Sequence, residues 1–129
     1  VDDLTASNSI LRSVFKAAVP ADMKAGVYTV DDAAPLIEKA MGDDVRTLVL
    51  MKSPITYKRL LKKVPELPKE LNVGPMSKRK GTTEVTPTSH LMPDEAQAVK
   101  DVVDQGAHVF FQQVPSQPVV EWDDVKDRF

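Results

Sequence analysis

Short apolar runs rich in β-branched residues alternate along this chain with stretches whose apolar residues recur at helical spacing. The clearest run, Val45–Met51, has the composition of a strand that is covered on both faces of a sheet. Each intervening helical stretch is long enough to cross over a sheet and start a parallel strand. The pattern therefore predicts an α/β fold, with a mostly parallel open sheet and helices on both faces in three αβα layers.

The other elements are predicted from periodicity and from punctuating residues in the same way. Val1-Asp2-Asp3 is interpreted as the end of a strand, Asp31 as a helix N-cap, and 83–88 as an edge strand or a loop because it contains a proline. The expected strands are 26–30, 45–51, 71–73 and 107–114, and the expected helices are 10–18, 34–41, 55–63, 93–105 and 120–126.

Length and composition limit the possible function classes. The 129 residues suit one domain, and the absence of cysteine excludes disulfides, thiolate catalysis and cysteine-ligated zinc. The net charge of −2, with both signs interspersed, gives no electrostatic case for nucleic acid as a partner. No apolar run approaches the length of a membrane span and no signal peptide is recognisable, so a cytoplasmic location is expected. Nothing in the composition calls for a cofactor.

The strand expected at 71–73 breaks at Gly74-Pro75, because proline has no N–H to give to a sheet ladder. The chain after this break is turned out at the carboxyl end of a strand, which is where open parallel sheets bind ligands. The loop Ser77–Thr82 then presents Lys78, Arg79 and Lys80. An ordinary solvated turn is the alternative interpretation.

Lys52-Ser53-Pro54 stands at a second strand-to-helix turn. Its backbone N–H groups, the Ser53 hydroxyl and the Lys52 charge could hold an anion at the positive end of the helix. The alternative is an N-cap serine followed by proline at the first helical position, with no ligand at all.

Neither the acidic start nor the histidines identify a site. Asp2-Asp3 could be an acid–base or metal pair, or the acidic start of a phospho-receiver domain. A receiver needs an aspartate at the end of its third strand, however, and the corresponding run here ends in Lys52-Ser53. His90, expected at the surface, and His108, expected to be structural, have no second ligand at metal spacing, so no metal site is predicted.

The order and spacing of these pieces resemble the IIB components of the mannose/fructose/sorbose family of bacterial sugar phosphotransferase systems. The resemblance rests on segments spread over nearly the whole chain: Val1-Asp2-Asp3, Ala17–Pro20, Leu48–Pro54, Asn72–Met76 with Gly81 and Val85, and Gly106–Pro118. It implies a phosphoryl carrier, which accepts a phosphoryl group from a histidine of a IIA partner. The carrier passes the group to a sugar held by membrane IIC and IID components.

The family's acceptor histidine lies after the first strand, in an Arg-x-Asp-x-Arg-Leu-Ile-His-Gly-Gln pattern that is absent here. Neither His90 nor His108 matches it, so the acceptor is expected outside these residues, in a chain that is incomplete at its N-terminus. Pro75 replaces the second glycine of the family's Gly-Gly pair, and Thr82 replaces a basic residue.

The resemblance implies a phosphate site lined by Lys52, Ser53, Asn72 and Gly74, with Arg79 and Lys80 docking the partner. The phosphotransferase would sit at the cytoplasmic side of the membrane permease. The alternative is a non-catalytic α/β module that binds a partner without carrying phosphate.

Overall fold

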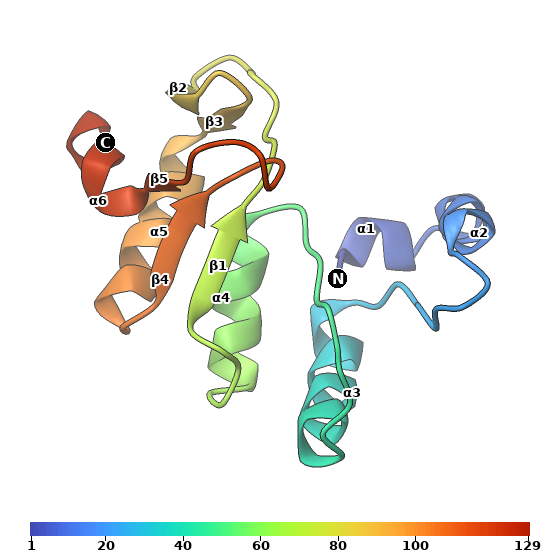
Figure 1. Ribbon diagram of the computed structural model, residues 1–129. Helices are drawn as coiled ribbons and strands as arrows, with labels where there is room; N and C mark the ends of the chain where they lie inside the picture. Colours follow the sequence, from blue (N-terminus) through green and yellow to red (C-terminus); the bar gives the residue numbers. More distant parts are fainter. The chain divides into compact units, whose positions relative to one another are not determined.

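The computed structural model describes residues 1–129, and the chain divides into two compact units. The N-terminal unit comprises Val1–Lys52 and Arg59–Glu66, and the C-terminal unit comprises Ser53–Lys58 and Leu67–Phe129. Figure 1 shows that every strand belongs to the C-terminal unit, whereas α1, α2 and α3 belong to the N-terminal unit.

The C-terminal unit is built on a three-stranded sheet in the order β1-β4-β5. Strand β1 (Glu70–Val73) runs parallel to β4 (His108–Phe111), with Val73 opposite Phe111. The short β5 (Val120–Glu121) is antiparallel to β4. The parallel pair confirms the strands expected around 71–73 and 107–114, with β4 ending three residues earlier than predicted.

The connection from β1 to β4 contains a hairpin and a helix. Strand β2 (Thr83–Thr86) pairs antiparallel with β3 (Ser89–Leu91), so the segment 83–88 begins as a strand. Helix α5 (Pro93–Asp104) then begins with proline at its first position, where a missing N–H costs nothing, and acidic residues in its first turn. Gly106, with a φ of 94°, follows its end in a conformation that favours glycine.

The chain ends in helix α6 (Trp122–Val125) and a 3-10 turn, η1 (Lys126–Arg128). The Trp122 ring is buried and stacks on Phe129 at 5.4 Å. The Arg128 guanidinium donates to the carbonyls of Glu84 and Val85 at 3.1 Å each, which ties the chain's end to β2.

The core of the C-terminal unit is apolar and closed. Phe111, Leu91, Val99 and Val102 are each at most 1% exposed. The other buried apolar residues of this unit are Tyr57, Leu67, Val73, Met76, Val85, Ala96, Ala98, Ala107, Val109, Trp122 and Val125. Burial on this scale is the main stabilising term for the unit.

Helix α4 (Pro54–Lys63) contributes residues to both units. The Ser53 hydroxyl accepts from the Ile55 N–H at 3.1 Å, so serine caps the helix as the second interpretation of this turn predicts. Within the C-terminal unit, the Lys58 ammonium lies 2.6 Å from an Asp101 carboxylate oxygen, which links α4 to α5.

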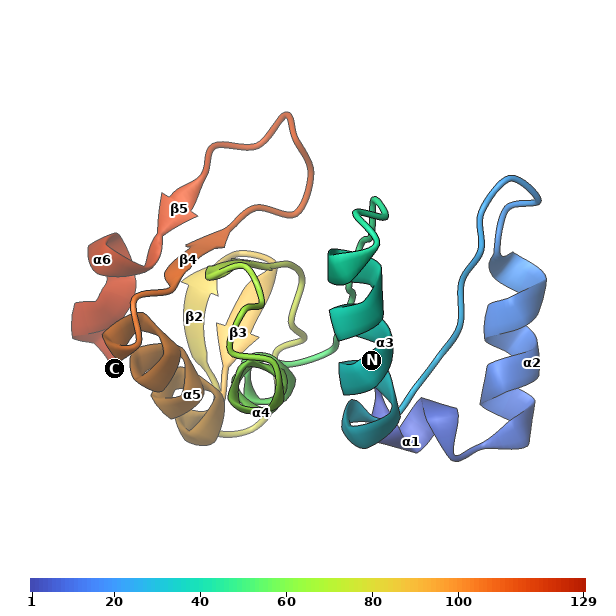
Figure 2. The same ribbon diagram turned by 90° about the horizontal axis from the view of Figure 1, so that it is seen from below.

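The N-terminal unit contains three helices: α1 (Asp3–Ala6), α2 (Ser9–Ala18) and α3 (Val30–Gly42). The Asn8 side chain caps α2, and the Thr29 hydroxyl accepts from the Asp32 N–H to cap α3. The expectation that Asp31 would cap α3 was wrong, because the helix already starts at Val30 and Thr29 is its N-cap. Figure 2 shows α2 standing apart from α3, and no residue of α2 is buried.

Two expected strands, 26–30 and 45–51, are not formed. Both segments lack ladder partners, and most residues of 45–51 are exposed, with Leu48 at 75%. A strand is held by hydrogen bonds to a neighbouring strand, and no strand of this structure pairs with either segment. The expectation of a covered strand at Val45–Met51 is therefore wrong for this structure.

The first two residues of the chain nevertheless form one hydrogen bond to each of the segments 26–30 and 45–51. The Asp2 N–H donates to the Tyr28 carbonyl at 3.1 Å, and the Val1 nitrogen donates to the Leu50 carbonyl. Val1 and Asp2 thus lie between the ends of the two segments that were expected to be strands. Asp3, in contrast, already belongs to α1 rather than to a strand end.

Candidate functional site

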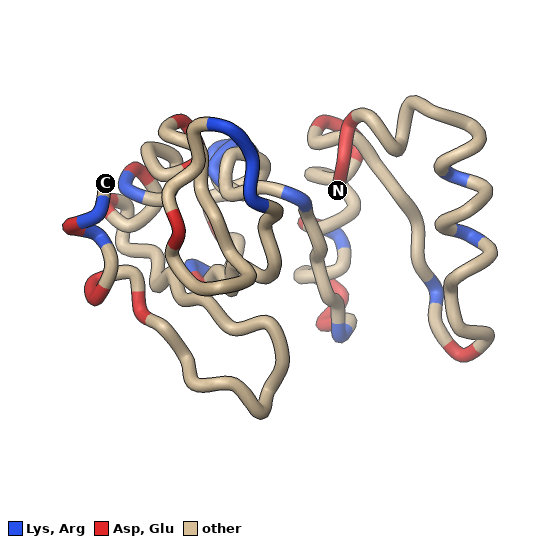
Figure 3. Tube along the Cα trace, turned by 90° about the horizontal axis from the view of Figure 1, so that it is seen from above, with Lys and Arg blue, Asp and Glu red and all other residues tan.

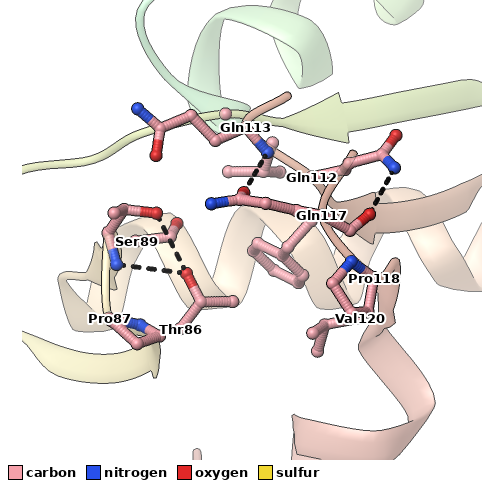
Figure 4. Close-up of a pocket in the computed structure, with 12 residues that line it drawn as sticks. Thr86, Pro87, Ser89, Gln112, Gln113, Gln117, Pro118 and Val120 are labelled. Carbon is pink, nitrogen blue, oxygen red and sulfur yellow. Dashed lines mark hydrogen bonds between the residues drawn. The ribbon is translucent and has the colours of Figure 1, made fainter. Parts of the chain in front are cut away.

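A half-open cavity of ≈ 250 Å³ lies where the parallel strands β1 and β4 end. Val73 and Gly74 at the end of β1, and Phe111 and Gln112 at the end of β4, contribute to its lining. Figure 4 shows Gln112, Gln113 and Gln117 on one side and the turn between β2 and β3 on the other. The sequence placed a ligand site at this edge of the sheet, and the cavity lies there.

The glutamine wall of this cavity is braced by its own hydrogen bonds. The Gln112 side-chain amide donates to the Gln117 carbonyl at 2.8 Å, and the Gln113 N–H donates to the Gln117 side-chain oxygen at 3.3 Å. The Asn72 side chain accepts from the Gln112 N–H at 3.0 Å and thereby joins the ends of β1 and β4. The hydrogen bonds among these residues therefore hold the glutamine wall in place without a ligand.

The opposite wall is the turn from Thr86 to Ser89. The Thr86 and Thr88 hydroxyls lie 3.4 Å apart, and the Thr88 N–H donates to Thr86 at 3.3 Å. Ser89 is 2% exposed, and its hydroxyl has no hydrogen-bond partner. A buried hydroxyl without a partner is uncommon, because leaving it unpaired costs roughly 1–3 kcal/mol.

Two of the predicted phosphate-site residues, Asn72 and Gly74, meet at the carboxyl end of β1, and Gly74 lines the cavity. Asn72 uses its side-chain oxygen in the brace to Gln112. Ser53 directly precedes α4, and Figure 1 shows that α4 starts at the end of the C-terminal unit where the β1 arrow points. Asn72 and Gly74 therefore lie at a strand end as the sequence predicts, whereas Ser53 precedes a helix but follows no strand, because the strand expected at 45–51 is not formed.

Lys52, the fourth predicted phosphate-site residue, is the last residue of the first stretch of the N-terminal unit. Its ammonium lies 3.0 Å from an Asp2 carboxylate oxygen. Burial raises the pKa of Asp2, but hydrogen bonds from Thr5 and Lys52 outweigh it, and the pKa is lowered overall. The Lys52 side chain is 72% exposed, so this pair is worth little and leaves the cation accessible to another anion.

Arg79 and Lys80 lie in the basic loop between β1 and β2, which Figure 3 shows as a continuous basic stretch. The Arg79 guanidinium is 2.9 Å from the Glu95 carboxylate, which is buried and also accepts from the Met92 N–H. Arg79 therefore fastens the loop to α5, because a buried carboxylate needs its partner. Lys80 is exposed.

His90 was expected at the surface, and that expectation was wrong. It is 8% exposed in β3, and its Nδ1 atom has no hydrogen-bond partner. His108 is a cross-strand partner instead: its Nε2 atom lies 2.7 Å from the Glu121 carboxylate, and its ring stacks on Phe110. No group of three histidine, aspartate or glutamate side chains is arranged to hold a metal ion.

The cavity residues opposite Gly74 were not expected from the sequence; they are Thr86, Ser89, Gln112, Gln113 and Gln117. One signal was available, because Gln112 and Gln113 lie in the last part of the strand expected at 107–114 and therefore near its carboxyl end. The turn that brings Thr86 and Ser89 to the same place depends on the β2–β3 pairing, which the proline at 87 obscured.

Comparison with known proteins gives one consistent match. Residues 1–128 match the family described as the sorbose subfamily IIB component of the phosphotransferase system. A probable phosphotransferase enzyme IIB component of Streptococcus pyogenes serotype M6 is 32% identical over 124 residues, which cover 92% of this chain and 76% of the relative.

Solved structures agree on the fold. The IIB domain of the sorbose permease from Klebsiella pneumoniae superposes with a TM-score of 0.88 at 22% identity, over 98% of this chain and 77% of that one. The N-acetylgalactosamine-specific IIB component 1 from Escherichia coli gives 0.84 at 20% identity, over 94% and 78%. The predicted three-layer α/β fold is thereby confirmed. No helix of this chain has the length and apolar character of a membrane span.

Proposed function

Since this chain belongs to the sorbose subfamily of phosphotransferase-system IIB components, we propose that it relays a phosphoryl group from a IIA phosphohistidine to a sugar. IIB components are phosphotransferases that work with the IIA, IIC and IID components of their system. The relay through a histidine, and transfer to a sugar held by IIC and IID at the cytoplasmic face of the membrane, are the specific parts of this proposal.

The chemistry consists of two substitutions at phosphorus. In the first, the bond from phosphorus to the IIA histidine breaks as a bond to the IIB histidine forms. In the second, a sugar hydroxyl oxygen replaces that nitrogen, and the hydroxyl proton passes to the freed imidazole. Such steps depend mainly on positioning and charge stabilisation, which strand-end loops with N–H groups and cations provide.

The observation that supports the site is the shared edge where β1 ends and α4 begins. Asn72, Gly74 and Ser53 supply backbone N–H and small polar groups there, and an anion is favoured at the N-terminus of a helix. Lys52, which directly precedes Ser53 in the chain, stays a proposed phosphate-site residue, and its pair with Asp2 is exposed. Of the two predicted docking residues, Lys80 suits IIA contact better, because Arg79 is engaged by Glu95.

We further propose that the acceptor histidine precedes Val1, in a chain whose first strand lies between the segments 26–30 and 45–51. Val1 and Asp2 support this, because their backbone nitrogens already bond one segment on each side. A strand leading into Val1 could pair the free N–H and C=O groups of both segments. An intact mass of the natural protein equal to residues 1–129, in a stable monomer, would refute it.

Incubation with ³²P-phosphorylated IIA tests the relay. The natural protein should take up acid-labile label on a histidine, and residues 1–129 alone should take up none. Label on His90 or His108 would contradict the assignment of the acceptor. The second candidate, a non-catalytic partner-binding module, predicts that the natural protein binds IIA without acquiring label.

A further inference from the structure

The basic loop Ser77–Thr82 is folded around the side chain of Arg79. We propose that Glu95 of α5 is a positioning residue, which acts through Arg79 to hold the shape of this loop. In that shape the loop presents Lys78 and Lys80 to an acidic surface of the IIA partner. The inference rests on the proposed function, which supplies that partner, and it goes further by adding Lys78 to the interface and giving Glu95 control of its geometry.

Arg79 is tied to α5 by a contact between a cation and a buried carboxylate. Its guanidinium lies 2.9 Å from the Glu95 carboxylate, whose side chain is 7% exposed, and donates to the His90 carbonyl at 3.4 Å. The same carboxylate accepts from the Met92 N–H at 2.8 Å. A buried carboxylate is stable only with its partners in place, so the pair fixes the guanidinium against α5.

Arg79 also holds the two ends of the loop. Its Nε atom donates to the Ser77 carbonyl at 3.1 Å. Its carbonyl accepts from the Thr82 N–H at 3.1 Å and from the Thr82 hydroxyl at 2.7 Å. Gly81, with a φ of 89°, lets the chain turn back at this point. The backbone on both sides of Arg79 is therefore held, and the two neighbouring lysines have fixed points of attachment.

Lys78 and Lys80 are the available cations of the loop. Both are exposed, and neither takes part in an ion pair of this structure. Figure 3 shows one continuous basic stretch here, on a chain whose net charge is −2. A local positive patch of this kind attracts a complementary negative patch and speeds the encounter with it.

The loop also stands beside the proposed phosphate site. It follows Gly74 and Met76, which leave the end of β1. The Met76 N–H donates to the Thr88 carbonyl at 3.0 Å, and the Met76 carbonyl accepts from the His90 N–H at 3.0 Å, which joins this segment to the β2–β3 hairpin. A IIA protein whose histidine approaches this edge of the sheet meets the loop next to the phosphoryl group. Charges at the margin of such an interface act on the encounter more than on the chemical step.

Other anionic partners fit the loop less well. Anionic membrane surfaces are bound by clusters of about four to eight cations, whereas only Lys78 and Lys80 are unpaired here. Single-stranded nucleic acid is bound by cations together with aromatic side chains, and the loop contains no aromatic residue. An acidic patch on a protein is the partner that two fixed cations suit.

Steady-state transfer of ³²P from phosphorylated IIA to the natural protein tests the positioning role. Glu95→Gln keeps the shape of the side chain and an acceptor for the Met92 N–H, but removes the charge that holds Arg79. We expect the KM for phosphorylated IIA to rise roughly three- to tenfold, because the two lysines must then be ordered on binding, while kcat changes by less than about twofold. Asp94→Asn is the matched control: Asp94 accepts from the Glu95 N–H but forms no hydrogen bond with the loop, so both constants should stay unchanged.

A double variant separates positioning from a direct contact with IIA. If Glu95 acts through Arg79, the variant that combines Arg79→Gln with Glu95→Gln should have the same KM as Glu95→Gln alone. It removes both charges, so it avoids the unpaired buried carboxylate that Arg79→Gln alone would leave. A KM that rises further in the double variant would show that Arg79 contacts IIA itself, and would refute the positioning role.

The loop amides give a readout that does not depend on activity. In ¹⁵N-labelled Glu95→Gln, the amides of 78–81 should shift and exchange faster with solvent, while those of β4 stay as in the wild type. Wild-type shifts throughout the loop would overturn the proposal, because the loop would then keep its shape without the pair.

The two lysines are tested by their effect on IIA affinity. Lys78→Gln and Lys80→Gln should each weaken binding roughly two- to fivefold at low salt and reduce its dependence on salt concentration. Lys62→Gln, an exposed lysine in the last turn of α4, should change neither. Unchanged affinity in both loop variants, or binding of the loop lysines to vesicles of phosphatidylserine and phosphatidylcholine in place of IIA, would refute the assignment of the partner.

Label uptake separates this inference from the proposed function. Transfer of label with a KM that Glu95→Gln leaves unchanged keeps the function and overturns the positioning role. If the natural protein takes up no label, the proposed relay fails, and calorimetric titration with unphosphorylated IIA then decides the inference. Equal affinity of the wild type and Glu95→Gln, or no binding to either, would overturn it.

Discussion

The two units of this chain bury their apolar residues to very different extents. The C-terminal unit surrounds a three-stranded sheet with covered side chains, and Phe111 in β4 is 1% exposed. The N-terminal unit forms no strand, and all the exposed large apolar residues except Val114 and Val119 belong to it. Its buried apolar residues are confined to α3 and the second half of α4 with the residue after it, namely Val30, Ala33, Ala34, Ile37, Leu60, Leu61 and Val64.

This difference cannot be explained by the sequences of the two units. Val45–Met51 is as rich in β-branched and apolar residues as β4, yet only β4 has neighbours on both sides. A strand is a property of a pairing rather than of a segment, since its N–H and C=O groups lie along its edges. The solved relative from Klebsiella shares the fold over 98% of this chain, so the open segments belong to the same fold.

The largest expected effect is the difference in stability between truncating a buried side chain, Phe111, and truncating an exposed one, Leu48. Phe111→Ala should lower the free energy of unfolding by about 3–5 kcal/mol, because it leaves a cavity in a closed core. Leu48→Ala should change it by less than about 0.5 kcal/mol, because the leucine is 75% exposed. Urea unfolding followed by fluorescence of Trp122, the single tryptophan, measures both. Equal losses in the two variants would contradict the comparison.

A smaller effect concerns how the N-terminal unit is held together. The Val30 N–H donates to Asp3 and the Arg59 guanidinium pairs with it at 3.0 Å, and these contacts, only partly opposed by burial, lower the pKa of Asp3. The stabilisation is therefore complete above the ordinary aspartate pKa of about 3.9 and is lost as the pH falls through the lowered value. Since the pair is exposed, the loss should stay below about 1 kcal/mol.

The Val30 amide reports this titration directly. Its NMR shift should change between pH 5 and 2 in the wild-type chain and should lose that change in Asp3→Asn, whereas Asp22→Asn, in an exposed turn, should keep it. A Val30 shift that titrates identically in Asp3→Asn would show that another group is responsible.

Sequence reasoning predicted the fold class because local signals agreed with tertiary structure in the C-terminal unit. Pro93 at the start of α5, Gly106 after its end and the apolar run of β4 are all local features, and all appear as expected. The reasoning failed where the outcome depends on a neighbour. The segments 26–30 and 45–51 have strand composition but no strand beside them.

The candidate site also combines residues whose position can be predicted from local sequence with residues whose position depends on distant partners. Asn72 and Gly74 could be placed at a strand end because the Gly-Pro break is visible in the sequence. The role of Arg79 could not be foreseen, because it depends on a buried Glu95 that lies 16 residues further along the chain. The glutamine and threonine walls of the cavity were missed for the same reason, since they meet only through the β1–β4 pairing and the β2–β3 turn.

Hydrogen exchange of the backbone amides of 45–51 tests the central claim most directly, namely that these segments are strand positions of the IIB fold that lack a neighbour. In residues 1–129 these amides should exchange freely while those of β4 are protected. In the natural protein, with the strand proposed before Val1, amides in 45–51 should become protected by about a hundredfold or more, towards the level of β4. Exchange that is equally fast in both proteins would contradict the claim.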